Sequence, residues 1–308
     1  MPLPEKFSSI EAILEQLESN RYIADQLLAT VIYLSHHMHK PIFLEGEPGV
    51  GKTEVAIVLS QIFESRLIRL QCYEGLDANA ALYEWNYPKQ LLRIKMDEHS
   101  GKTPEEIGQV IYSEPYLTKR PLLEAILNSQ KDHPVLLIDE LDRADEEFEA
   151  FLLEILSDFQ VSIPEVGTIK ATHKPQVVIT SNRTRDIHDA LKRRCLYHWI
   201  DYPDPAKEQQ IIRARIPGIE ETLALQVAGF MQAIRKEDLM KKPGTSETLD
   251  WAEALLKLNR GVLNEAVVEQ TLGCILKYRE DIQKFRSTIW TDPDKRSQLL
   301  AAGRISPC

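Results

Sequence analysis

The amino-acid sequence predicts an α/β fold in which a parallel five-stranded sheet is flanked by helices, followed by an all-helical C-terminal domain. Short apolar runs alternate with stretches of helical periodicity over the first two thirds of the chain, as in parallel α/β sheets. The run Val135–Ile138 is uninterrupted, which is typical of a strand buried on both faces. After Pro205 the pattern becomes almost wholly helical.

The predicted elements follow one another in a simple order. Apolar residues between Ser9 and His39 recur at helical spacing in two runs, and Pro41 then ends the second helix. The predicted strands are 42–44, 67–70, 135–138, 177–179 and 197–200. Helical stretches between them include 54–63, 121–129 and 146–158.

Two segments do not fit a minimal α/β repeat, and they shape the predicted domain organisation. Residues 77–118 form a long insertion, and residues 161–174 resemble a hairpin around Gly167. We expect a nucleotide-binding domain over residues 1–205 and a helical lid domain with C-terminal helices over 206–308.

Composition limits the class of protein. The 308 residues carry 47 Asp and Glu against 37 Lys and Arg, a formal net charge of −10, which disfavours a general nucleic-acid binder or a protein of anionic membranes. Four scattered cysteines show no metal-ligand spacing and predict reduced thiols. Without an apolar stretch long enough for a secretion signal or a membrane span, we expect a soluble cytoplasmic protein.

The strongest motif follows the first predicted strand. Gly46, Gly51, Lys52 and Thr53 match the GxxxxGK[ST] phosphate loop, in which backbone N–H groups and a helix N-terminus surround an anion. Lys52 would reach the β- and γ-phosphates, and the Thr53 hydroxyl would bind Mg²⁺. We therefore predict ATP and Mg²⁺ binding by Gly46, Glu47, Pro48, Gly49, Val50, Gly51, Lys52, Thr53 and Glu54.

Acidic and amide side chains follow two later strands. Asp139 could hold the water shell of Mg²⁺ and Glu140 could act as general base, although acidic residues also favour helix starts. Asn182 could orient the attacking water, or it could cap the next turn. Because ligands of open α/β sheets bind beyond the carboxyl ends of strands, these groups and Lys52 can converge on one γ-phosphate.

Two adjacent arginines precede the last predicted strand. Arg193 and Arg194 close a helix, where basic residues are favoured by the helix dipole. One of them could instead be an arginine finger supplied to a neighbouring subunit's nucleotide. The pattern alone does not choose between the two.

With these residues, the chain resembles AAA+ ATPases of the MoxR family from about Tyr22 to Leu258. Residues 46–53 resemble the Walker A motif, 135–142 the Walker B motif and Asn182 the sensor 1 residue. The segment 151–163 resembles the helix and pre-sensor hairpin of that clade, and the insertion within 77–118 resembles its helix-2 insert.

The resemblance also implies roles for single residues. It places the arginine finger at Arg194 and sets Tyr22 and Ile23 beside the adenine, although the pattern at these two residues is equally that of ordinary core. The family usually carries a sensor 2 arginine at the start of a lid helix, but Thr248 stands at that position. The stretch 246–251 is similar to a branch associated with carbon monoxide dehydrogenase maturation.

For the whole protein, the resemblance implies a homo-oligomer, a hexameric ring that hydrolyses ATP and remodels or matures client proteins in a chaperone-like manner. The clients of the family are often metalloenzymes, and a partner with a von Willebrand factor A domain often acts beside the ring. Two alternatives remain: a nucleic-acid motor or loader, which the acidic composition disfavours, and a nucleotide-gated scaffold without turnover, which Glu140, Asn182 and Arg194 disfavour.

Overall fold

The computed structural model of the chain describes residues 7–98, 101–129 and 133–302. Two compact units are present. Unit 1 contains residues 1–13, 26–45 and 53–199, and unit 2 contains 14–25, 46–52 and 200–308. The expected domain boundary at residue 205 stays a prediction. No helix within the described ranges is long and apolar enough to cross a membrane.

The predicted parallel sheet is confirmed. Its five strands lie in the order β2-β5-β8-β1-β9. The registers place Leu67 beside Val135 and Ile42 beside Val178. The bounds are β1 Ile42–Gly46, β2 Leu67–Gln71, β5 Val135–Asp139, β8 Gln176–Ser181 and β9 Leu196–Ile200.

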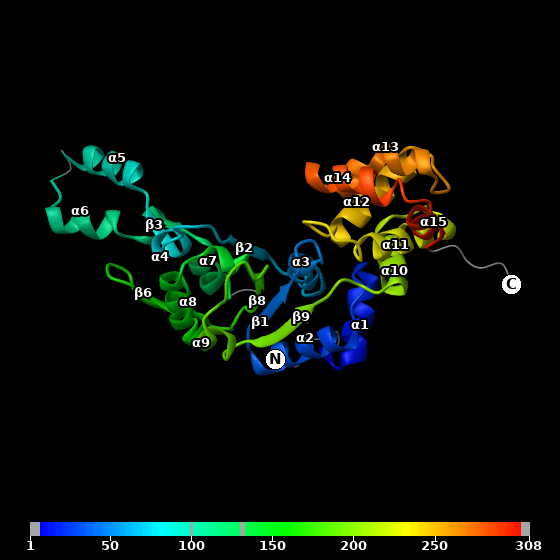
Figure 1. Cartoon of the computed structure of the whole chain (residues 1–308). Coiled ribbons are helices and arrows are strands. Elements are labelled where there is room, and N and C mark those ends of the chain that lie inside the picture. The colour runs from blue at the N-terminus through cyan, green and yellow to red at the C-terminus, as the bar shows by residue number, and fades with distance from the viewer. Residues whose placement is uncertain (1–6, 99–100, 130–132, 303–308) are drawn as a thin grey trace. The chain divides into compact units, whose positions relative to one another are not determined.

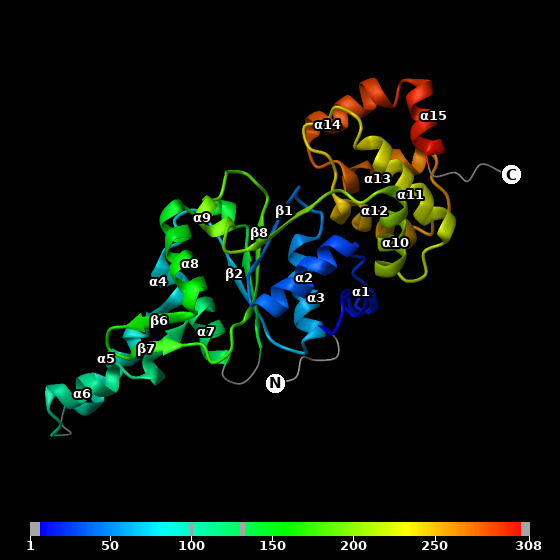
Figure 2. The same cartoon turned by 90° about the horizontal axis from the view of Figure 1, so that it is seen from below.

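Helices cover both faces of this sheet, as the buried strands require. Figure 2 shows α2 (Gln26–Met38) and α3 (Lys52–Ile62) on one face and α7 (Pro121–Asn128) and α8 (Glu146–Asp158) on the other. Alternate side chains of the central strands, such as Ile138 and Ile179, are completely buried against α7 and α8. This core fixes the carboxyl ends of β5 and β8 side by side.

The insertion forms a substructure of unit 1 that extends away from the sheet (Figure 1). Two short antiparallel strands are its base, and a pair of helices forms its tip. Trp85 in the base is buried and packs edge-on against Tyr112, whereas Tyr87 at the start of the tip is exposed. The elements are α4 Ala78–Leu82, β3 Tyr83–Trp85, α5 Tyr87–Asp97, α6 Pro104–Ile111, a 3₁₀ turn Glu114–Tyr116 and β4 Leu117–Lys119.

The segment expected to form a hairpin contains two antiparallel strands that follow α8, β6 (Gln160–Ile163) and β7 (Gly167–Lys170). Gly167 has φ +94°, a left-handed conformation that glycine adopts without strain. The remaining elements of residues 10–192 are α1 Ile10–Ser19, a 3₁₀ turn Leu141–Arg143 and α9 Asp189–Lys192.

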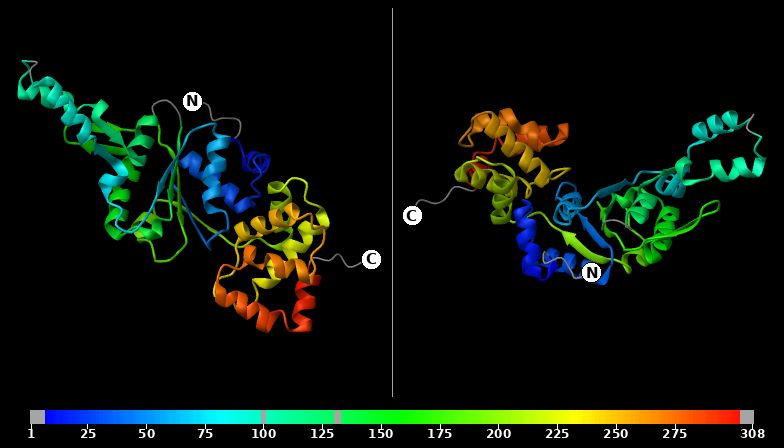
Figure 3. Two further views of the ribbon diagram at one scale, coloured as in Figure 1. Left: turned by 90° about the horizontal axis from the view of Figure 1, so that it is seen from above. Right: turned by 180° about the vertical axis from the view of Figure 1, so that it is seen from behind.

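The helical C-terminal region is also confirmed, and Figure 3 shows its helices gathered in one bundle. Its core contains buried aromatic rings, with Phe230 in contact with both Trp251 and Phe285. The bounds are α10 Pro205–Arg215, α11 Glu221–Ile234, α12 Thr245–Lys257, α13 Glu265–Ile275, α14 Arg279–Lys284, a π-helical turn Phe285–Ile289 and α15 Pro293–Ala301.

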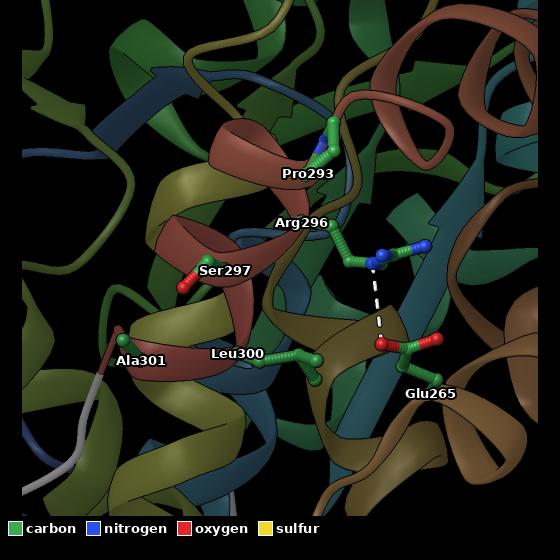
Figure 4. A pocket seen from close by; sticks show the side chains of 6 residues that line it. All are labelled: Glu265, Pro293, Arg296, Ser297, Leu300 and Ala301. Atoms are coloured by element: carbon green, nitrogen blue, oxygen red, sulfur yellow. Dashed lines mark ion pairs between the residues drawn. The ribbon is translucent and has the colours of Figure 1, made fainter.

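A shallow pocket lies between α13 and α15 of this bundle (Figure 4). Its two charged side chains pair with each other, Arg296 Nε lying 3.2 Å from Glu265 Oε1. The charge that a polar ligand would need is therefore already neutralised. The lining residues are Glu265, Pro293, Arg296, Ser297, Leu300 and Ala301.

Candidate functional site

The phosphate loop connects β1 to α3 and curves through left-handed glycines. Gly49 has φ +80° and Gly51 has φ +95°, conformations that side chains other than glycine rarely adopt. At Gly49 there is also no space, because an added Cβ would lie 2.5 Å from Ser246 Oγ. Successive N–H groups can turn inward in such a loop, and α3 begins directly at its end.

Lys52 lies against the loop that precedes it. Its buried ammonium group donates to the carbonyl oxygens of Gly46 and Glu47, both at 2.8 Å. The positive charge is therefore held at the inner side of the turn, where a phosphate group would bind. Pro48 and Val50 lie in the same turn, and Glu54 lies in the first turn of α3.

Two other segments of unit 2 contact this loop. The N–H of Ser246, in the first turn of α12, donates to the carbonyl oxygen of Gly49 at 3.0 Å. On the other side, the ring of Tyr22 lies 3.9 Å from the position of a Cβ at Gly51, and Tyr22 and Ile23 are both half-buried. The Tyr22 ring beside the loop offers an apolar surface suited to an adenine ring.

Asp139 ends β5 and is almost completely enclosed, with 3% of its side chain exposed. Its Oδ1 accepts hydrogen bonds from the hydroxyls of Thr53 at 3.0 Å and Thr180 at 2.6 Å. Its Oδ2 accepts two bonds from the Arg69 guanidinium, from Nε at 3.0 Å and from Nη2 at 2.5 Å. The structure thus brings together Thr53 and Asp139, which were predicted as the metal-side pair.

Glu140 follows directly and is held less tightly. Its backbone is left-handed, with φ 55° and ψ 52°, and its N–H donates to Thr180 Oγ1 at 2.9 Å. Its carboxylate, 34% exposed, accepts from Gln71 Nε2 at 3.1 Å and from Asn182 Nδ2 at 3.5 Å. Strain at a non-glycine residue is typical of functional positions, and a third of the side chain is open to solvent water.

Asn182 is positioned by a carboxylate to which sequence reasoning gave no separate role. Buried Asp142 accepts from the N–H of Asn182 at 3.1 Å. It also accepts from the N–H and the hydroxyl of Thr184, at 2.9 and 2.7 Å. These bonds fix the turn after β8 so that the Asn182 amide faces Glu140.

Three further residues of this site were missed, namely Arg69, Gln71 and Thr180. Arg69 and Gln71 come from the edge strand β2, and Thr180 comes from the buried strand β8. The sequence signal for Thr180 is its place directly before Ser181-Asn182, at the carboxyl end of a predicted strand. Arg69 and Gln71 carry no motif, but both follow from the strand order once β2 is known to lie beside β5.

The charges of the site act on the nearby thiol of Cys72. Burial first, and then the carboxylates of Asp139, Asp142 and Glu140, raise the pKa of Cys72 to about 12. The thiol therefore stays protonated at neutral pH.

The two arginines before β9 are both exposed, and Arg194 is attached to its own subunit. Its Nη1 donates to the carbonyl oxygen of Leu153 at 2.5 Å and to the hydroxyl of Ser157, both in α8. In this conformation Arg194 links the turn before β9 to α8. A role in trans requires that these bonds exchange for bonds to a phosphate.

Thr248, at the family position of sensor 2, is buried in the helical unit. Its hydroxyl donates to Glu208 Oε1 at 2.6 Å and accepts from Arg235 Nη2 at 3.0 Å. Arg235 forms a two-pronged ion pair with Glu208, at 2.7 and 2.6 Å, and donates to the carbonyl oxygen of Pro243 at 2.8 Å. An arginine missed by sequence reasoning therefore lies near the start of α12, but its bonds are to protein groups.

The donors at Thr53 and Asp139 fit a magnesium ion. Both present hard oxygen atoms, the ligands that Mg²⁺ prefers, and the Thr53 hydroxyl proton points to Asp139, so its lone pairs face away. Thr53 directly follows Lys52 in the chain, so the hydroxyl that donates to Asp139 belongs to the residue next to the phosphate-binding lysine.

Comparisons with known proteins agree with this geometry. A family model described as AAA domain (dynein-related subfamily) matches residues 41–195. An uncharacterized protein of Staphylococcus aureus (strain NCTC 8325) is 26% identical over 228 residues, which cover 72% of this chain and 77% of that protein. An uncharacterized protein of Staphylococcus haemolyticus is 25% identical over 248 residues, covering 78% and 85%.

Among solved structures, a mutant of RuvB from Thermotoga maritima matches with a TM-score of 0.49 at 15% identity, over 94% of this chain and 82% of that one. A candidate ATPase from Cytophaga hutchinsonii matches with a TM-score of 0.44 at 16% identity, over 97% and 96%. The family model covers half of the chain and spans the phosphate loop, Asp139, Glu140 and Asn182. The chain belongs to the AAA domain family, in its dynein-related subfamily, and is an AAA+ P-loop protein.

Proposed function

We propose that this protein is an ATP-hydrolysing, MoxR-type AAA+ ATPase that acts as a chaperone-like remodelling or maturation factor. One observation carries the hydrolytic part of the proposal. Thr53, Asp139, Glu140 and Asn182 come from three different elements of unit 1 and meet at the carboxyl ends of β5 and β8. A protein that only binds nucleotide has no need of a base and a water-orienting amide at that place.

Each side chain has a role in this proposal. The phosphate loop binds the phosphates through its N–H groups and Lys52, and Tyr22 and Ile23 border the adenine. Thr53 and, through water, Asp139 would hold Mg²⁺, which neutralises charge on the phosphates when bound. Glu140 accepts a proton from the attacking water, and Asn182 Nδ2 orients that water through a hydrogen bond.

The proposed assembly is a homo-oligomeric ring, a form common among AAA+ proteins. Six subunits are implied by the MoxR resemblance. In such a ring Arg194 acts as the finger on a neighbour's nucleotide and stabilises charge in the transition state. Its position supports this role, because it is exposed and its two bonds to α8 are to a carbonyl and a hydroxyl, which a phosphate oxygen can outcompete.

The proposed clients are proteins, and metalloenzymes in particular, with a von Willebrand factor A domain protein as helper. The insertion supports a protein partner, since α5 exposes Leu91, Leu92 and Met96 at 60% or more on one short helix. The choice of metalloenzymes and of the helper rests on the MoxR resemblance.

The test of hydrolysis is Glu140→Gln. We expect it to keep nucleotide binding and to reduce phosphate release at least a hundredfold, since a general base contributes about 10²–10⁴ in rate. Binding is followed with a fluorescent ATP analogue, and turnover by release of inorganic phosphate.

The matched control is Glu147→Gln, which makes the same chemical change on an exposed residue of α8. Its turnover should equal that of the unaltered protein. Normal turnover in Glu140→Gln would show that the base has been assigned wrongly, and a protein without turnover in any form would favour a nucleotide-gated scaffold.

A further inference from the structure

The metal-side carboxylate of Asp139 has no acceptor position left. A carboxylate offers about four lone-pair positions. Thr53 and Thr180 fill those of Oδ1, and the two nitrogen atoms of Arg69 fill those of Oδ2. A metal-bound water can donate to Oδ2 only after at least one guanidinium bond has broken.

The side chain of Arg69 is placed so that it can move away from Asp139. It belongs to the edge strand β2, where Arg69 and Gln71 alternate with the buried Ile68 and Leu70. Its side chain is 54% exposed, whereas that of Asp139 is 3% exposed. The guanidinium can therefore turn into solvent without disturbing the core, while the carboxylate cannot move away.

Arg69 is also connected to the proposed base. Its Nη2 donates to Gln71 Oε1 at 2.7 Å, and Gln71 Nε2 donates to Glu140 Oε2 at 3.1 Å. A continuous chain of hydrogen bonds thus runs from Asp139 through Arg69 and Gln71 to Glu140. Movement of the guanidinium must change the bonds that orient Gln71, and through it the carboxylate of Glu140.

We propose that Arg69 is the resident cation of the metal site, which pairs with Asp139 until Mg²⁺ arrives and is displaced from Oδ2 by it. This inference rests on the proposed nucleotide-binding function and names a regulator of the same site. The two guanidinium bonds already fill the acceptor positions of Oδ2, so a metal-bound water must replace one of them, and the repulsion between the two cations adds to the competition. Displacement of Arg69 releases Gln71, so that metal binding is coupled to the orientation of Glu140.

The test is the Mg²⁺ dependence of nucleotide binding in Arg69→Met. A fluorescent, non-hydrolysable ATP analogue is held at one concentration while Mg²⁺ is titrated. We expect the half-saturating Mg²⁺ concentration to fall roughly tenfold. This change corresponds to the loss of one charge-assisted hydrogen bond, whose contribution is lowered because Arg69 is exposed. The half-saturating Mg²⁺ concentration of Arg69→Lys should lie between those of Arg69→Met and the unaltered protein, because lysine keeps the charge but loses the paired donors.

The control is Arg66→Met, at the residue directly before β2. Arg66 is exposed and pairs with Glu124 at 2.7 Å, so its loss changes the net charge equally and leaves Asp139 untouched. Its half-saturating Mg²⁺ concentration should not change. A second measurement is thermal unfolding, in which Mg²⁺ with the analogue should stabilise Arg69→Met more than the unaltered protein.

Each outcome decides for or against the proposal. An unchanged or higher half-saturating Mg²⁺ concentration in Arg69→Met overturns it, with nucleotide binding itself still in place. If the Met variant does not fold, Arg69→Lys decides by the same criterion. If the unaltered protein binds no analogue at any Mg²⁺ concentration, the proposed function fails first, and the role of Arg69 falls with it.

Discussion

The buried ion pair between Arg235 and Glu208 makes a sharp prediction about the helical unit. Arg235 is 5% exposed and Glu208 is completely buried. Replacing Arg235 with Met leaves the carboxylate without its cation, while Gln232 and Thr248 still donate to it. Breaking a buried pair in this way costs about 3–5 kcal/mol, a large part of the roughly 5–15 kcal/mol that stabilises a typical domain.

The assay is urea unfolding followed by tryptophan fluorescence, to which Trp251, fully buried in the same bundle, contributes. Arg213→Met is the control, because Arg213 and Glu221 form an exposed pair at 3.0 Å. Such a pair contributes about 0–1 kcal/mol. The double variant Arg235→Met/Glu208→Leu should recover much of the lost stability, since removal of both charges is often neutral.

The result that would refute this reasoning is a small loss of stability with a large loss of nucleotide affinity. Arg235→Met would then destabilise the bundle by less than about 1 kcal/mol, and Arg235 would be a nucleotide contact in place of the sensor 2 arginine. We expect the reverse. Any effect on affinity should be indirect, through Pro243, which precedes the start of α12 beside the phosphate loop.

Two other changes test the site and the core of unit 1. Thr180→Val removes the donor to Asp139 and the acceptor of the Glu140 N–H. We expect the free energy of unfolding in urea to fall by about 2–4 kcal/mol, and phosphate release to fall in the Val variant and to be restored in Thr180→Ser. Equal turnover of the Val and Ser variants would contradict this role. Burial, and then three neighbouring histidines, lower the pKa of His36 from 6.5 to about 4, so the unfolded chain binds more protons between these values and stability falls as the pH drops below about 6.5. After allowance for the partial exposure of His36, the free energy of unfolding should fall by about 1 kcal/mol by pH 5. The fall should be smaller in His36→Phe, whose ring suits the surrounding phenylalanines. Equal pH dependence of the variant and the unaltered protein in urea unfolding would rule out this role of His36.

Strands and the phosphate loop could be predicted because their signals are local. The apolar run before Asp139 is the strand itself, and the spacing of Gly46, Gly51 and Lys52 is set by the loop geometry alone. No knowledge of distant segments is needed for either. The same holds for Asp139 and Glu140, which follow a strand directly.

Arg69, Thr180 and Arg235 could not be assigned because their roles depend on what lies beside them. The first two act on Asp139 only because β2 and β8 flank β5, and the order of strands in a parallel sheet is not written in their sequences. Arg235 directly follows α11 as its C-terminal cap, where a basic residue is expected for the helix dipole alone. Its partner Glu208 is 27 residues away in the chain.

The two adjacent acids of the site differ in a way that assigns their roles. Asp139 is enclosed and accepts four bonds of 2.5 to 3.0 Å, so its orientation is fixed by the fold. Glu140 is one third exposed, and each of its carboxylate bonds is longer than 3.0 Å. A general base must move to meet the water it deprotonates, whereas a group that positions a metal must not. Of the two carboxylates, only Glu140 has that freedom, and the bonds that restrain it come from Gln71, Asn182 and Arg143, which can each be changed without removing the acid.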